Sequence, residues 1–215
     1  MAEELVVPSG GNKEEKYIAL LPQLEALVDP EAGFIANAAN CAAALHQTFG
    51  HLWTGFYLVK QDSHAPETHN AENLAAEDLA AENLAAGTPA SHGELVLGPF
   101  QGPIACTRIG YGRGVCGTAW KEGRTLIVPD VNEFPGHIAC SSASRSEIVV
   151  PVFNRQSSRH PDGNFRRRIG REIDWAPGRH EDEEIIAVLD IDSSDIGTFD
   201  ETDKKYLEKI CSLLA

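Results

Sequence analysis

The stretch ELVLGPFQGPIACTRIGYGRGVCGTAWKEGRTLIV, residues 94–128, contains the features that decide the fold class. Three apolar runs of strand length, 94–100, 103–109 and 124–128, are bounded by turn residues, as is typical of β-strands. Glycines bracket the segment 114–123, which is typical of a short helix. Strands linked in this way favour a mostly antiparallel sheet.

The same patterns continue on both sides of this stretch. Three further runs have strand character: 52–60, 146–153 and 184–192. Helical spacing of apolar residues marks three longer segments: 13–28, 31–49 and 199–214. Gly50 is a typical helix stop and Asp200 a typical N-cap. The sequence therefore predicts an α+β fold with about six mostly antiparallel strands and helices packed on one face.

Two irregular segments interrupt this pattern. Residues 61–93 contain the repeat AENLA-AEDLA-AENLA, six acids and no Lys or Arg, and a period of five matches neither helix nor strand. Residues 154–182 hold seven of the eleven Arg, but five acids are interleaved, which favours a solvated insertion over a basic docking patch. We expect a single domain over 1–215 with flexible insertions at 61–93 and 154–182.

Overall composition restricts the class of protein. Eighteen Lys and Arg against 32 Asp and Glu give a net charge of −14, which argues against a general nucleic-acid or anionic-membrane binder. The N-terminus lacks the features of a signal peptide, and no run approaches the roughly 18 apolar residues of a membrane span. Five cysteines do not fit a secreted disulfide scaffold. We expect a cytoplasmic protein with mostly reduced thiols.

The five cysteines fall into two groups. Cys41 and Cys211 lie in apolar helical segments and are expected to be buried as small hydrophobic residues. Cys106, Cys116 and Cys140 lie at a strand end, a helix start and a polar loop, where reactive groups are presented, although chance placement would give the same pattern. A cysteine near a helix N-terminus could have a lowered pKa. The spacings C-x9-C and C-x23-C do not match a zinc site.

Three acids and two aromatic residues are candidates for a binding pocket. Asp190 and Asp192 are two apart in a strand and therefore project from the same face, and Glu147 opens another strand. Solvated strand ends are the ordinary role of such acids, but three that converge would suit an ammonium ligand. Trp53 and Tyr57 share a strand face, where core packing is the commoner role and a pocket wall the alternative.

These motifs together resemble one family. The resemblance is carried by WTGFYLV (53–59), GPIACTRIGYGRGVCGTAW (102–120), LIVPDVNEFPGHIACSSASRSEIVVPV (126–152), IAVLDIDS (186–193) and FDETDKKYLEKI (199–210). The chain is similar to the free methionine-(R)-sulfoxide reductases, which are built on a GAF domain. The resemblance implies a GAF-like six-stranded antiparallel sheet, a homodimer and free methionine-(R)-sulfoxide as substrate. Neither irregular segment is covered by it.

The resemblance also implies residue roles. Cys140 matches the catalytic nucleophile, Cys106 the main resolving cysteine, and Cys116 a second thiol able to pair with Cys140. The matching pocket residues are the aromatic pair and the acid trio: Trp53, Tyr57, Glu147, Asp190 and Asp192. Glu147 is also the candidate acid for the sulfoxide oxygen. Electrons would pass through cysteine, so no organic or metal cofactor is expected, and a thioredoxin-like dithiol would regenerate the enzyme.

Two other functions fit the same fold. A GAF domain can act as a non-catalytic sensor that binds a small metabolite or cyclic nucleotide, because fold does not fix function. The same cysteines could instead serve a redox sensor without turnover. The three thiols together with the acid trio favour the reductase.

Overall fold

The computed structural model describes residues 4–61, 93–138, 142–154 and 184–214. The two predicted insertions fall almost entirely outside the described residues, as does Cys140. None of the helices in the described ranges is long and apolar enough to cross a membrane.

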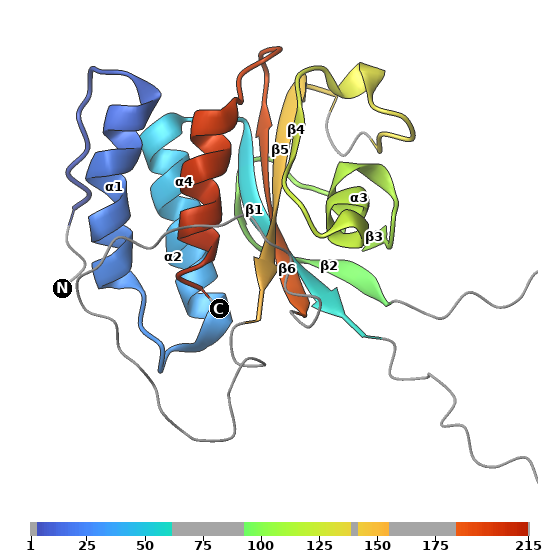
Figure 1. Cartoon of the computed structure of the whole chain (residues 1–215), viewed down its shortest axis with the longest axis horizontal. Coiled ribbons are helices and arrows are strands. Elements are labelled where there is room, and N and C mark those ends of the chain that lie inside the picture. The colour runs from blue at the N-terminus through green and yellow to red at the C-terminus, as the bar shows by residue number, and fades with distance from the viewer. Residues whose placement is uncertain (1–3, 62–92, 139–141, 155–183, 215) are drawn as a thin grey trace, which may run out of the picture.

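A six-stranded antiparallel sheet forms the centre of the structure (Figure 1). Its strands, in spatial order, are β3 (Arg108–Gly110), β2 (Glu94–Gln101), β1 (Trp53–Lys60), β6 (Ile185–Ser193), β5 (Ser146–Phe153) and β4 (Leu126–Val128). Every neighbouring pair is antiparallel. The predicted α+β class and strand number are confirmed. Strands distant in sequence, such as β1 and β6, lie side by side at the centre.

Three helices cover one face of the sheet, as predicted: α1 (Lys13–Leu27), α2 (Gly33–Phe49) and α4 (Glu201–Cys211). Both α1 and α4 begin with capping boxes, formed by Asn12 and Asp200, which satisfy backbone N–H groups at the helix starts. The alternate residues of the central strands that face these helices are apolar, among them Phe56, Ile148 and Leu189, and they form the main core.

The fourth helix, α3 (Gly114–Glu122), lies on the opposite face of the sheet (Figure 1). The helix packs closely against the end of β3 because Gly117 has no side chain. A Cβ at this position would lie 2.4 Å from the carbonyl oxygen of Gly110. A second hydrophobic cluster, which includes Trp120, Val149 and Val188, fills the space beneath it. This arrangement brings the first turn of α3 over the ends of β5 and β6.

The third predicted strand is much shorter than expected. Residues 103–107 are not in a strand, and only Arg108–Gly110 pair with β2. Pro103 has no N–H to donate to a ladder, and its carbonyl instead accepts a hydrogen bond from Trp53 Nε1 at 3.1 Å. The following Ile104 is 90% exposed, so the apolar run that suggested a strand is not buried. A short 3-10 helix, Val131–Glu133, follows β4.

Candidate functional site

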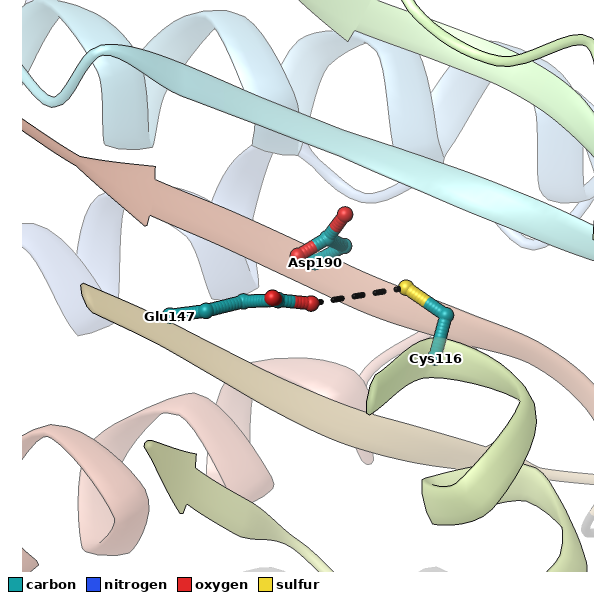
Figure 2. A group of neighbouring side chains, drawn as sticks. All are labelled: Cys116, Glu147 and Asp190. Carbon is teal, nitrogen blue, oxygen red and sulfur yellow. Dashed lines mark hydrogen bonds between the residues drawn. The ribbon is translucent and has the colours of Figure 1, made fainter. Parts of the chain in front are cut away.

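The side chains of Cys116, Glu147 and Asp190 meet on the α3 side of the sheet (Figure 2). They come from α3, β5 and β6, and one ligand atom from each lies within 4.8 Å of the others. The strand register explains why the acids lie together. Glu147 pairs with Asp192, and Val149 with Asp190, so the three acid side chains project from the same face of the sheet. Cys116 reaches them from the first turn of the helix above.

This group is almost completely removed from solvent. Cys116 is 4% exposed, Glu147 5% and Asp190 6%. The Cys116 Sγ lies 3.8 Å from Glu147 Oε1, within hydrogen-bonding range for sulfur. Asp190 Oδ1 is buried and receives no hydrogen bond from any described residue. Asp192, beside it, accepts a hydrogen bond from the Ser144 hydroxyl.

Burial and mutual repulsion make these acids hold protons unusually tightly. Burial raises the pKa of Glu147 well above its ordinary value, and the charges of Asp190 and Asp192 raise it further. The pKa of Asp190 is also well above its ordinary value, through burial and then Asp192. Burial raises the pKa of Asp192 to about 6, while the Ser144 hydrogen bond opposes the shift. The cluster therefore favours a nearby cation or a bound proton.

The expectation that Cys116 could have a lowered pKa is wrong. Burial raises the pKa of this thiol well above its ordinary value, and the nearby negative charges of Asp190 and Glu147 raise it further. These effects outweigh the helix N-terminus, whose influence on a nearby charge is modest. Cys116 is thus a protonated thiol in the site as it stands, not a ready nucleophile.

A small cavity of about 30 Å³, open to solvent, adjoins this cluster. It is lined by the first turn of α3, by the acids and by a neighbouring loop: Ile109, Arg113, Gly114, Val115, Cys116, His137, Ile138, Ser144, Glu147, Asp190 and Asp192. The first backbone N–H groups of α3 have no acceptor within the helix, and no side chain in the described ranges caps them. The residues of this first turn, Gly114–Cys116, line the cavity. The cavity thus combines an acidic wall with the positive end of a helix.

The two aromatic residues lie on the same sheet face but do not line this cavity. Trp53 pairs with Asp192 in the β1–β6 ladder, and its ring is stacked on Tyr57 at 5.8 Å between centroids. Both side chains are buried, and burial followed by the charge of Asp190 keeps the Tyr57 hydroxyl protonated by raising its pKa. Gly55 lies beneath the Trp53 ring, where a Cβ would approach Trp53 Cη2 to 2.5 Å.

The structure separates the remaining cysteines as follows. Cys41 and Cys211 are buried free thiols in the main core, which confirms their expected packing role. Burial raises the pKa of Cys41 to about 12. Cys106 is half-buried and is in disulfide form, whereas Cys116 is a free thiol. Cys140, the candidate nucleophile, lies outside the described residues.

Three cavity residues with polar or charged side chains were not identified from the sequence: Arg113, His137 and Ser144. The signal for Arg113 was present, because it precedes a Gly-bracketed helix that has no Ser, Thr, Asp or Asn to cap it. Ser144 lies in a run of several serines, and nothing in the sequence distinguishes it from them. His137 carries no motif, and burial lowers its pKa.

Comparisons with known proteins identify the family of the chain. The GAF domain family model matches residues 34–215. GAF domain-containing protein A of Dictyostelium discoideum is 46% identical over 214 residues, covering 100% of this chain and 99% of the relative. The free methionine-R-sulfoxide reductase of Saccharomyces cerevisiae is 32% identical, covering 99% and 91%. The X-ray structure of the free methionine-R-sulfoxide reductase of Neisseria meningitidis, in complex with its substrate, has a TM-score of 0.67 and 39% identity, covering 98% and 93%.

Proposed function

We propose that this chain, which belongs to the GAF domain family and is closely related to the free methionine-R-sulfoxide reductases, reduces free L-methionine-(R)-S-oxide to L-methionine. The observation that carries the proposal is the acid trio at the cavity, in which Glu147 and Asp190 are buried and Asp192 is partly buried. Three carboxyl groups packed this closely are costly unless a cation joins them. The α-ammonium of a free amino acid supplies that cation.

The same charge requirement explains why the substrate would be a free amino acid. A methionine sulfoxide within a peptide has an amide in place of the ammonium, so it leaves the acids uncompensated. The carboxylate of the free amino acid would bind at the first turn of α3, where uncapped N–H groups and Arg113 line the cavity. The cavity is therefore complementary to a zwitterion.

The proposed reaction begins at Cys140. Its thiolate attacks the sulfoxide sulfur while Glu147 gives a proton to the departing oxygen, so that methionine leaves and Cys140 becomes a sulfenic acid. A carboxyl group whose pKa is raised by burial, as that of Glu147 is, holds this proton near neutral pH. Trp53 does not line the cavity, so it would contact the S-methyl end of the substrate only after its ring moves towards the cavity.

Regeneration would use the second cysteine. Cys106 attacks the sulfenic acid and releases water, which forms a Cys106–Cys140 disulfide, and an external dithiol such as thioredoxin then reduces that disulfide. The disulfide form of Cys106 and the buried free thiol of Cys116 support Cys106 as the main resolving residue, with Cys116 as a possible relay. We also propose that the protein is a homodimer.

An activity assay tests the proposal. The reduced protein is incubated with a dithiol and, separately, with free methionine-R-sulfoxide, its S epimer and a peptide that contains the sulfoxide. We expect loss of the free R epimer alone, abolished in Cys140→Ser and unchanged in the control Cys41→Ala. Equal turnover by Cys140→Ser and the unaltered protein would refute the mechanism. Binding of a small metabolite without turnover would favour the sensor.

A further inference from the structure

We propose that Cys116, Glu147 and Asp190 form a binding site for a thiophilic divalent cation, with Zn²⁺ as the best match (Figure 2). The site would use one sulfur and two carboxylate oxygens as ligands, and the cation would be held only while Cys116 is a thiol or thiolate. The metal site itself does not depend on the proposed reductase activity. Its expected competition with an amino-acid substrate does rest on that proposed function.

The spacing of the donor atoms supports this assignment. The Cys116 Sγ and Glu147 Oε1 are 3.8 Å apart, and all three donor atoms lie within 4.8 Å of one another. A tetrahedral Zn²⁺ with a Zn–S bond of about 2.3 Å and Zn–O bonds of about 2.0–2.2 Å separates such ligands by about 3.5 Å. The side chains would therefore have to close by roughly 1 Å around the ion, which small side-chain rotations can provide.

The unpaired oxygen of Asp190 is independent support for a ligand. Asp190 is 6% exposed and its Oδ1 is buried, yet no described residue donates a hydrogen bond to it. A buried acceptor without a partner is costly, and a cation bound by this oxygen would remove that cost. Binding would also offset the negative charge of Asp192, which lies two residues along the same strand.

The ligand set also has the form of an open site. Three protein ligands leave the fourth position of a tetrahedral ion free, and all three ligands line the cavity, from which a water or other ligand could reach the ion. Cation binding displaces the thiol proton of Cys116 to solvent, so no change in oxidation state is involved. If Cys116 is oxidised to a disulfide, its sulfur is no longer available as a thiolate ligand, and we expect binding to be lost.

The spacing of cysteines in the sequence gave no sign of this site, because only one of its three ligands is a cysteine. The three ligands come from three different elements, α3, β5 and β6, and only the fold brings them together. Two of them are carboxylates, which are common in the chain and carry no spacing signature for a metal.

Cobalt substitution provides a direct test, because Co²⁺ bound to a thiolate gives a charge-transfer absorption band. The full chain is reduced, stripped of metal and titrated with Co²⁺, and the bound Co²⁺ is then displaced with Zn²⁺. We expect one ion per chain with one thiolate ligand. Cys116→Ser should remove the band and weaken binding more than the roughly 10–100-fold that loss of an outer-shell partner costs.

The remaining variants separate this site from other thiols and from misfolding. Asp190→Asn, which keeps the shape of the side chain, should weaken binding at least about tenfold. Cys140→Ser and Cys41→Ala should keep both the band and the affinity, and far-ultraviolet circular dichroism verifies the fold of each variant. A band that survives in Cys116→Ser, a band lost in Cys140→Ser, or no Co²⁺ binding by the unaltered chain would each overturn the inference.

Competition with methionine distinguishes the two proposals. If both are right, free methionine displaces Co²⁺ because its ammonium needs the same acids. If the band depends on Cys116 but methionine does not displace the ion, the metal site stands and the proposed substrate site is wrong. If the chain reduces methionine sulfoxide but binds no Co²⁺, the metal inference alone falls.

Discussion

Replacement of Asp192 by Asn should stabilise the fold at neutral pH and weaken the activity. Burial raises the pKa of Asp192 from its ordinary 3.8 to about 6. This rise in pKa corresponds to a penalty of ~3 kcal/mol for keeping the group ionised in the folded protein. The penalty is absent below pH 3.8, grows between pH 3.8 and 6, and is complete above pH 6. Asn carries no charge and can still accept the Ser144 hydrogen bond.

Urea unfolding at two pH values measures this effect. At pH 8, with a chelator present to exclude metal ions, Asp192→Asn should raise the free energy of unfolding by about 1–3 kcal/mol, which raises Tm by roughly 2–4 °C for each kcal/mol. Near pH 4 the difference should almost vanish. The control Asp195→Asn alters an exposed acid in the turn after the same strand and should change neither value.

The same substitution should reduce activity. Loss of one charge facing the substrate ammonium costs about 2–5 kcal/mol in a buried pair, so kcat/KM for free methionine-R-sulfoxide should fall roughly 30-fold or more. A variant that is no more stable than the unaltered protein at pH 8, or whose stability gain persists at pH 4, would refute the electrostatic reasoning. Unchanged kcat/KM would instead remove Asp192 from substrate binding.

Three further predictions test other parts of the structure. Glu147→Gln should lower kcat by about 10²–10⁴-fold if Glu147 is the proton donor, as steady-state kinetics would show, whereas methionine binding, which keeps Asp190 and Asp192, should weaken much less. Gly55→Ala should clash with Phe100 Cβ and displace the Trp53 ring, with a cost of about 1–3 kcal/mol in urea unfolding. Burial lowers the pKa of His51 to about 4. Because the unfolded chain binds a proton at His51 and the folded protein does not, the free energy of unfolding should fall as the pH drops from 6.5 towards 4. His51→Phe should remove this fall, as urea unfolding at several pH values would show.

The sheet and the acid cluster could be predicted because they depend on local alternation. Alternate residues of the two strands, such as Ile148, Leu189 and Ile191, face the helices and are apolar. Glu147, Asp190 and Asp192 occupy intervening positions and so lie on the opposite face. Their apolar helical surroundings placed Cys41 and Cys211 in the core.

Long-range packing explains what could not be predicted. The apolar character of 103–107 suggested a strand, but Ile104 is exposed and Pro103 is held by Trp53, a contact fifty residues away in sequence. The face that α3 covers depends on the close approach of Gly117 to Gly110, which no periodicity reveals. The raised pKa of Cys116 follows from that placement, because it sets the thiol against acids from two distant strands.

The acid cluster connects substrate binding with proton delivery in the proposed reaction. Without a cation, Glu147 and Asp190 hold protons because burial and repulsion raise their pKa values. When an ammonium group enters, its positive charge favours the ionised carboxylates and lowers those pKa values. A proton held by Glu147 therefore becomes easier to release when the sulfoxide oxygen is in place to receive it. A peptide substrate, which lacks the ammonium, would fail at both steps, in binding and in proton transfer.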